Sequence, residues 1–200
     1  MKSLYSLKPW FSKLLKPILK ASIRAKISPD FYTLLNIVFG CLAGAAVTWL
    51  NGWLVLLFVV LRLACANLDG ALARAKQVVE NKAPAKSGFA KNEIGDRLAD
   101  FGMLFGLFYL ASEQHAMTVL LAVLVAAVPT LVSLVGVSKG VARINGGPFG
   151  KTERCFLTVL IVFVANLSGQ VETSVYVGSI VIIIGSLITA WVRYLKIIKS

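Results

Sequence analysis

The stretch Asp69-Gly70-Ala71-Leu72-Ala73-Arg74 lies in a long apolar run, and Gly88 and the pair Asp96-Arg97 follow it in a second one. A charge at membrane depth costs roughly 2.5–3.5 kcal/mol on insertion scales, so a partner, a cavity or a metal ion usually holds it. These charged positions therefore predict a buried polar site within apolar helices.

The composition indicates a membrane protein. Hydrophobic residues make up 58% of the 200 residues, and the mean hydropathy is +0.79, well above the values of soluble domains. The net charge of +12 lies mostly in short polar segments between apolar runs, so it indicates membrane topology and no nucleic-acid partner. Three cysteines without CxxC spacing and a single histidine exclude a zinc or haem site.

Residues 1–28 combine seven Lys and Arg with leucine, tryptophan and phenylalanine at helical spacing. This pattern predicts a basic amphipathic helix in the headgroup layer, broken into pieces at Pro9 and Pro17. A signal peptide is the alternative, but the segment has neither an unbroken apolar region nor a small-residue cleavage site.

Hydropathy predicts six transmembrane helices in one domain over 29–200, each near the ~20 residues that a bilayer requires. The predicted spans are 31–50, 53–75, 89–112, 116–138, 153–168 and 174–195. Lys and Arg gather in the segments 76–91, 139–154 and 193–199, and the connections near 51–52, 113–115 and 169–173 have none. The predicted fold is therefore an all-α, integral multi-pass protein of the inner membrane, preceded by the interfacial helix, with both termini and the site cytoplasmic.

Polar stripes on the second and third spans predict a cleft between them. Asn92, Asp96 and Asp100 recur every four residues, and Arg62 and Asp69 are seven residues apart on one helical face. Oxygen donors without His or Cys suit a hard cation such as Mg²⁺ or Mn²⁺, which bridges protein carboxylates and a substrate phosphate. For the deeper residues, Arg62 and Asp100, a simple structural ion pair is the preferred interpretation.

At these residues the chain resembles the CDP-alcohol phosphotransferases, whose signature reads D-x-x-D-G-x-x-A-R, a gap, then G-x-x-x-D-x-x-x-D. The matching positions are Asp69, Gly70, Ala73, Arg74, Gly88 and Asp96. Ala66 and Asn92 stand where the signature has its first and third aspartates. The segment Ser28-Pro29-Asp30-Phe31-Tyr32-Thr33 also resembles the family's entry to its first span.

The resemblance implies a transferase of phospholipid biosynthesis that moves a phosphatidyl-type group from a CDP-activated lipid to an alcohol and releases CMP. It implies Asp69 and Asp96 as catalytic residues and metal ligands, with Asn92 as a neutral ligand for Mg²⁺ or Mn²⁺. It also implies nucleotide-binding positions, which are Thr33, Gly70, Ala73, Arg74 and Gly88. A homodimer among membrane lipids is implied in the same way.

The two missing aspartates leave alternatives open. Asn67 and Glu93 neighbour the altered positions but are rotated by about 100° on an ideal helix, so only a local π-bulge would bring one into the site. Otherwise the chain is a one-metal enzyme or an inactive relative that binds nucleotide or lipid as a scaffold. A cation-coupled transporter is disfavoured because Asp69 and Asp96 are predicted near one membrane face.

The segment 143–154 contains a Gly-Lys-Thr sequence that is not a P-loop, because Asn145 replaces the first glycine and no strand precedes it. Arg143, Lys151 and Arg154 are either topological charges around a turn or an anion pocket at a helix start. The second interpretation predicts a phosphorylated polyol as the acceptor.

Small residues on the first and third spans permit close helix packing. They are Gly40, Gly44, Gly102 and Gly106. The sequence leaves open whether this packing is within one chain or between two copies.

Overall fold

The computed structural model describes residues 8–80 and 86–199, the side chains of residues 78–80 and 86–87 excepted. Throughout this described part the chain forms helices and no strand, which confirms the predicted all-α class. In chain order the helices are α1 (Lys8–Leu14), α2 (Lys16–Arg24), α3 (Pro29–Thr48), α4 (Gly52–Glu80), α5 (Lys86–Tyr109), α6 (Glu113–Val125), α7 (Val128–Ser138), α8 (Lys151–Ser168) and α9 (Val171–Ile198).

The segment predicted as a broken amphipathic helix forms α1 and α2, each with a proline near its start. Residues 1–7 of the predicted helix lie outside the described residues, as does Lys82 of the predicted basic segments. Ser22 of α2 is buried, and its Oγ lies 2.6 Å from the hydroxyl oxygen of Tyr32 on α3. The basic side chains of both helices are exposed, so the segment packs on the bundle through one face only.

Four stretches of the described chain are long and apolar enough to span a membrane. They are Pro29–Thr48, Gly52–Gln77, Glu113–Ser138 and Val171–Ile198. The two remaining predicted spans coincide with α5 and α8, whose charged side chains keep them below that apolar composition. Asp96 on α5 and Lys151 and Arg154 on α8 are among these charged side chains.

The predicted span 116–138 consists of two helices, α6 and α7, which meet at Ala126 and Ala127. Pro129 in the first turn of α7 has no N–H to donate to the preceding turn, so the regular ladder is interrupted there. The N–H missing at Pro129 is the one that would have bonded to the carbonyl oxygen of Val125. The carbonyl oxygen of Pro129 itself accepts hydrogen bonds from Arg193 Nη1 at 2.8 Å and from Ser133 Oγ at 3.1 Å, so the first turn of α7 also holds a buried arginine of α9.

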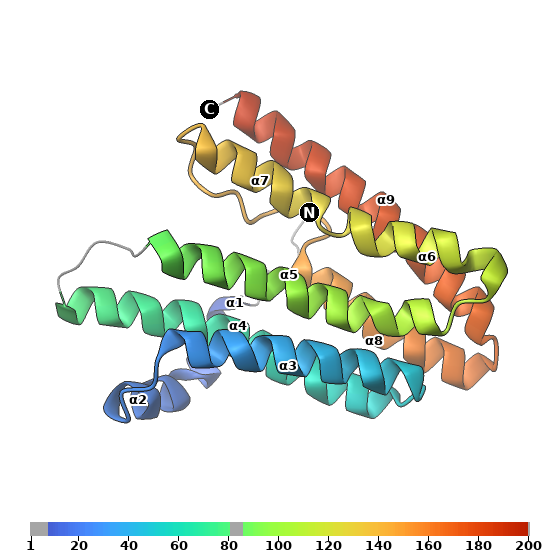
Figure 1. Ribbon diagram of the computed structural model, residues 1–200, viewed down its shortest axis with the longest axis horizontal. Helices are drawn as coiled ribbons and strands as arrows, with labels where there is room; N and C mark the ends of the chain where they lie inside the picture. The colour runs from blue at the N-terminus through green and yellow to red at the C-terminus, as the bar shows by residue number, and fades with distance from the viewer. Residues whose placement is uncertain (1–7, 81–85, 200) are drawn as a thin grey trace.

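Helix α3 packs along both α4 and α5, and α9 packs along α6, α7 and α8 (Figure 1). A Cβ added to Gly40 would meet the backbone of Ala99 on α5, and one added to Gly44 would meet the backbone of Gly102. These glycines therefore serve packing within the chain, which resolves the alternative that the sequence left open.

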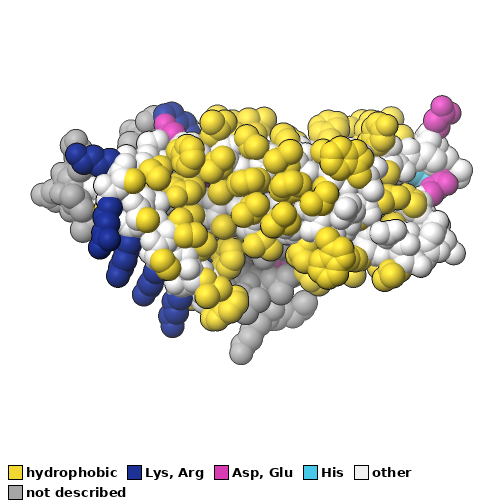
Figure 2. All heavy atoms as spheres, turned by 90° about the horizontal axis from the view of Figure 1, so that it is seen from below, with side chains coloured by type: hydrophobic (Ala, Val, Ile, Leu, Met, Phe, Trp, Pro, Cys, Tyr) yellow, Lys and Arg dark blue, Asp and Glu magenta, His cyan; other side chains and the backbone are white. Residues whose placement is uncertain are grey.

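Figure 2 shows a broad band of hydrophobic side chains on the visible face, with Lys and Arg gathered at one end beside some acidic atoms, and further acidic side chains and the histidine at the other end. Such a band matches the hydrocarbon layer of a bilayer, and the charged ends match its two aqueous faces. The protein is an integral membrane protein.

Candidate functional site

A polar cavity of about 220 Å³ opens among α4, α5, α7, α8 and α9. Its lining includes most of the predicted site residues, which are Asp69, Gly70, Arg74, Asn92, Asp96, Arg143, Lys151 and Arg154. The helical periodicity explains this gathering, because each polar stripe turns toward the interior and away from the apolar surface.

The carboxylate of Asp69 is buried on α4 and accepts hydrogen bonds from three neutral groups. Its Oδ2 accepts from Asn92 Nδ2 at 2.6 Å and from Thr33 Oγ1 at 3.3 Å, and its Oδ1 accepts from the backbone N–H of Gly70. Thr33, predicted to bind the nucleotide, thus contacts Asp69 but does not line the cavity itself.

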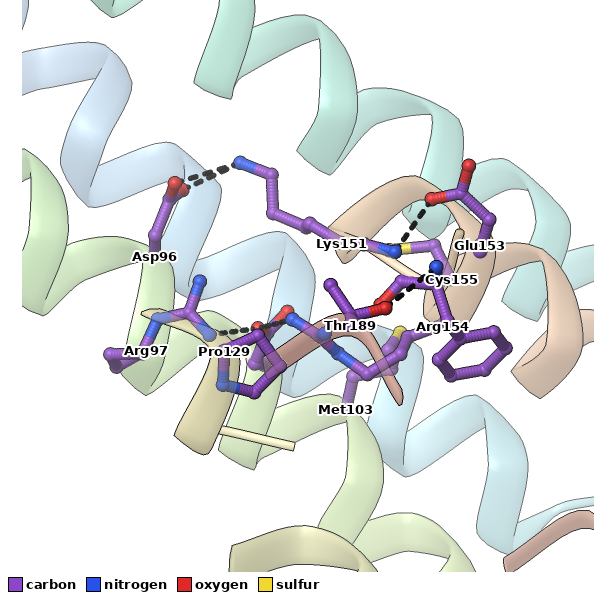
Figure 3. A network of polar contacts seen from close by, with 12 residues as sticks. Asp96, Arg97, Met103, Pro129, Lys151, Glu153, Arg154, Cys155 and Thr189 are labelled. Atoms are coloured by element: carbon purple, nitrogen blue, oxygen red, sulfur yellow. Dashed lines mark hydrogen bonds and ion pairs between the residues drawn. The ribbon is translucent and has the colours of Figure 1, made fainter. Parts of the chain in front are cut away.

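The carboxylate of Asp96 faces a lysine. Lys151 Nζ donates to Oδ1 and Oδ2 of Asp96 at 2.8 Å and 2.9 Å, and Figure 3 shows the lysine extending from the start of α8 to this carboxylate. Asn36 Nδ2 of α3 donates to the same Oδ1 at 3.0 Å. Asp96 is therefore held by one cation and one amide.

One turn further along α5, Asp100 is surrounded by arginines. It forms ion pairs with Arg62, with Arg97 at 2.7 Å and with Arg154 at 2.7 Å. Arg62, Arg154 and Asp100 are all at most 2% exposed. The predicted pairing of Arg62 with Asp100 is confirmed, and its full environment contains two further guanidinium groups.

The three basic residues predicted as an anion pocket each pair with a carboxylate of α5. The pairs are Arg143 with Glu93, Lys151 with Asp96, and Arg154 with Asp100. The segment 143–154 is therefore attached to α5 by three charge contacts, all beside the cavity. These partners were not predicted from the sequence, and the anion pocket stays a prediction for residues that line the polar cavity.

The remaining predicted nucleotide positions differ in their surroundings. Gly70 lines the cavity, and the guanidinium of exposed Arg74 lies close to it, with Nη1 3.3 Å from where a Cβ would stand. Ala73 is half-buried and Gly88 is exposed with open space around it, and neither lines the cavity. The structure thus brings Gly70 and Arg74 to the site and leaves Ala73 and Gly88 beside it.

The residues next to the altered signature positions do not replace the missing carboxylates. Helices α4 and α5 remain α-helical there, with no π-bulge in the described part. Asn67 exchanges hydrogen bonds with Ser12 of α1 at 3.0 Å and 3.2 Å, and Glu93 pairs with Arg143. Ala66 does line the cavity, so its methyl group lies where the signature has a carboxylate.

The donor set does not provide the four aspartates of the signature, which by the family resemblance would hold two divalent ions. Within residues 8–80 and 86–199, no three His, Cys, Asp or Glu side chains lie together as metal ligands. The oxygen donors that the cavity brings close to one another are the carboxylates of Asp69 and Asp96 and the amide of Asn92, whereas Glu153, which also lines it, accepts the backbone N–H of Gly150. These three can offer oxygen ligands to one hard divalent ion, provided that the amide turns its oxygen inward.

Two residues of the site were missed by the sequence analysis. Asn36 is fully buried and holds Asp96, and Arg193 lines the cavity and donates to the carbonyl oxygens of Asn145 and Gly146, each at 3.0 Å. The signal for Asn36 was a lone amide in an apolar span, three residues after Thr33 and hence on the same helical face. Arg193 was counted only as a topological charge.

An apolar groove of about 710 Å³ adjoins the polar cavity. It runs along α4 and α8 past Leu63, Val59 and Phe163 to Trp53 at the start of α4. Lys8, Ala66, Lys151 and Thr152 line both spaces, so the polar and apolar spaces are continuous.

Comparison with known proteins gives one relative in sequence and several in structure. No family model matches the chain. The inner membrane protein YnbA of Escherichia coli (strain K12) is 27% identical over 159 residues, which cover 78% of this chain and 76% of that protein.

Two crystal structures of Mycobacterium tuberculosis phosphatidylinositol phosphate synthase (PgsA1) superpose on most of the chain. The structure with CDP-DAG bound has a TM-score of 0.69 and 20% identity and covers 92% of this chain and 94% of its own. The complex with manganese and citrate has a TM-score of 0.68 and 20% identity and covers 92% and 88%. The chain therefore has the fold of phosphatidylinositol phosphate synthase.

Proposed function

We propose that this protein is a divergent CDP-alcohol phosphotransferase, which transfers a phosphatidyl-type group from a CDP-activated lipid to an alcohol. The observation that carries the proposal is the cavity in which Asp69, Asn92 and Asp96 face basic residues beside an apolar groove. The groove suits acyl chains, and the cavity suits a charged headgroup. The shared fold with a synthase whose structure contains CDP-DAG supports the same function.

In this reaction the alcohol oxygen attacks the lipid-bearing phosphorus, the bond to the CMP phosphate breaks, and CMP leaves. Asp96 is proposed as the base that takes the hydroxyl proton. Arg74 stabilises the charge of the diphosphate, and the absence of a side chain at Gly70 lets the diphosphate approach the backbone. Thr33 acts through Asp69. Ala73 and Gly88 remain nucleotide positions by resemblance only.

A divalent ion, Mg²⁺ or Mn²⁺, is part of the proposal. The ligands would be Asp69, Asn92 and Asp96, and the ion would supply charge neutralisation for the diphosphate. The manganese in a structure of the same fold supports this cofactor.

The acceptor is proposed to be an alcohol that carries a phosphate group. Arg143, Lys151, Arg154 and Arg193 all line the cavity, and guanidinium and ammonium groups are the usual partners of phosphate in proteins. Three of these basic groups pair with carboxylates. An acceptor phosphate would therefore replace a carboxylate as the partner of a basic group.

The membrane arrangement belongs to the proposal as well. All six predicted spans, with α6 and α7 as one, cross the bilayer of the inner membrane, and α1 and α2 lie in its headgroup layer. The basic end, with both termini and the cavity, faces the cytoplasm by the positive-inside rule. A homodimer follows from the family resemblance alone.

A second candidate is a binding protein that has lost catalysis. Ala66 in the cavity and Lys151 on Asp96 favour it, because both reduce the negative charge available to metal ions. Such a protein would bind a CDP-activated lipid without releasing CMP.

The test is CMP release by the purified protein in nanodiscs with CDP-diacylglycerol, Mg²⁺ or Mn²⁺, and a panel of alcohols and phosphorylated polyols. Acceptor-dependent CMP should vanish in Asp69→Asn and Asp96→Asn and persist in Asp30→Asn, an exposed carboxylate that pairs with Lys91. CMP release that survives both substitutions would refute the assigned roles. Binding of the CDP-lipid without any CMP would select the second candidate.

A further inference from the structure

We propose that the ammonium group of Lys151 is a built-in cation of the cavity, which competes with a divalent ion for the carboxylate of Asp96. The inference rests on the divalent ion of the proposed function, and it concerns a residue of this chain that no signature position specifies. It assigns Lys151 the role of counter-ion to Asp96 when no divalent ion is bound.

The geometry of the contact is that of a cation on a carboxylate. Lys151 Nζ lies within 2.9 Å of both Asp96 oxygens, and the lysine side chain is 23% exposed against 11% for the aspartate. With Asn36 also donating to Oδ1, both oxygens that a metal ion would bind are already hydrogen-bonded. A carboxylate has about four lone-pair sites, so Oδ2 keeps one for an ion, and an ion bound there would be repelled by the ammonium group and would compete with it for the carboxylate.

Lys151 occupies a position in its helix that is unfavourable for a positive charge. Lys151 is the first residue of α8, where the helix dipole disfavours a positive charge, and Arg154 adds another in the same turn. Glu153, the acid of this turn, accepts the backbone N–H of Gly150 at 2.9 Å and so serves as a cap. The ion pair with Asp96 on α5 offsets this unfavourable placement. The stability of the lysine at this position therefore depends on Asp96.

Asp69 and Asp96 differ in the charge of their hydrogen-bond partners. Asp69 accepts its hydrogen bonds from Gly70, Thr33 and Asn92, all neutral, whereas Asp96 is paired with a full positive charge. A divalent ion near Asp69 would also be repelled by the ammonium group, since both residues line one cavity. Removing the ammonium group should therefore strengthen divalent binding.

The experiment measures Mn²⁺ binding to the purified protein in detergent, from the electron paramagnetic resonance signal of the free ion. Lys151→Met keeps an unbranched side chain that is one atom shorter and removes its charge, and it should lower the dissociation constant for Mn²⁺ by about tenfold or more. Lys151→Arg keeps the charge and should bind Mn²⁺ as the unaltered protein does. Lys139→Met removes an exposed lysine at the end of α7 and controls for the change in net charge.

The double variant Lys151→Met with Asp96→Asn assigns the effect. The reference for the double variant is Asp96→Asn alone. If Asp96 is the released ligand, Lys151→Met raises the Mn²⁺ affinity less in the Asp96→Asn background, where only the repulsion of an ion near Asp69 is removed. A Lys151→Met protein with unchanged Mn²⁺ affinity, or a gain of equal size with and without the Asp96 carboxylate, would overturn the inference. Because the readout is ion binding, it is independent of CMP release, and either proposal can fail alone.

Discussion

Gly44 of α3 and Gly102 of α5 meet backbone to backbone, so that a Cβ on Gly44 would overlap the carbonyl oxygen of Gly102. Gly106 meets Gly44 in the same way from the next turn of α5. This close approach brings Asn36 of α3 within 3.0 Å of Asp96. The packing of two helices thereby sets the position of a site carboxylate.

Gly44→Ala should lower the free energy of unfolding by about 1–3 kcal/mol or more, because the added methyl group meets backbone that cannot turn aside. Thermal melting in detergent measures the loss. Gly88→Ala is the matched control, since a Cβ there has nothing within 4 Å and its stability should be unchanged or slightly raised. Equal melting temperatures for both variants would contradict the assigned packing.

Asp100→Asn should destabilise the protein by about 3–5 kcal/mol, because it removes the only carboxylate shared by Arg62, Arg97 and Arg154 in the described contacts. Three guanidinium groups would then repel one another in a buried site. Glu172→Gln is the control, since Glu172 is 52% exposed and water screens its pair with His115, so the stability should hardly change. A loss of similar size in both variants would argue against a special role for Asp100.

Asn92→Asp should make the stability of the protein depend on divalent ions. The new carboxylate would lie where the amide now donates to Asp69 Oδ2 at 2.6 Å, so the two acids would repel each other without a cation. Melting in the presence of a chelator should therefore fall below that of the unaltered protein. Mn²⁺ at about 100 times its dissociation constant should restore about 2.7 kcal/mol.

The control for this ion dependence is Asn67→Asp, which changes an amide outside the cavity that is bonded to Ser12. Its melting temperature should respond to Mn²⁺ no more than that of the unaltered protein. The same response in both variants would place the ion elsewhere.

Arg193→Lys should loosen the segment that leads into α8. The guanidinium donates to Asn145, Gly146, Pro129 and Ser133, a set that one ammonium group cannot reach at once. Hydrogen exchange at the amide of Phe149, which donates to Thr189 Oγ1 at 2.8 Å, should accelerate by about tenfold. Tyr194→Phe, at an exposed position, should leave that rate unchanged, and an unchanged rate in both variants would mean that other contacts hold the segment.

Local periodicity was enough to predict which side chains share a helix face. It grouped Asn92, Asp96 and Asp100 on α5 and predicted the pair of Arg62 with Asp100, because spacing within a helix fixes direction. The small residues at Gly44 and its neighbours predicted close packing but not whether the partner helix belongs to the same chain. These features depend on helices that the hydropathy pattern identifies directly.

The contacts made by Lys151 and Arg193 could not be predicted in this way. Their partners depend on how the segment 139–150 folds. Most of this segment lies outside the helices, so no helical periodicity indicates where its residues point. The break between α6 and α7 was missed because the apolar pattern continues through Pro129. Hydropathy reports which residues avoid water, and it does not report where a backbone carbonyl loses its donor.

The three ion pairs along α5 differ in their access to water. The basic partner is 33% exposed in the pair of Arg143 with Glu93, 23% exposed in the pair of Lys151 with Asp96, and 2% exposed in the pair of Arg154 with Asp100. Salt screens exposed charges far more than buried ones, so the outermost pair yields first and the innermost last. The segment 143–154 should therefore detach from α5 progressively, beginning at its exposed Arg143 end and ending at Arg154.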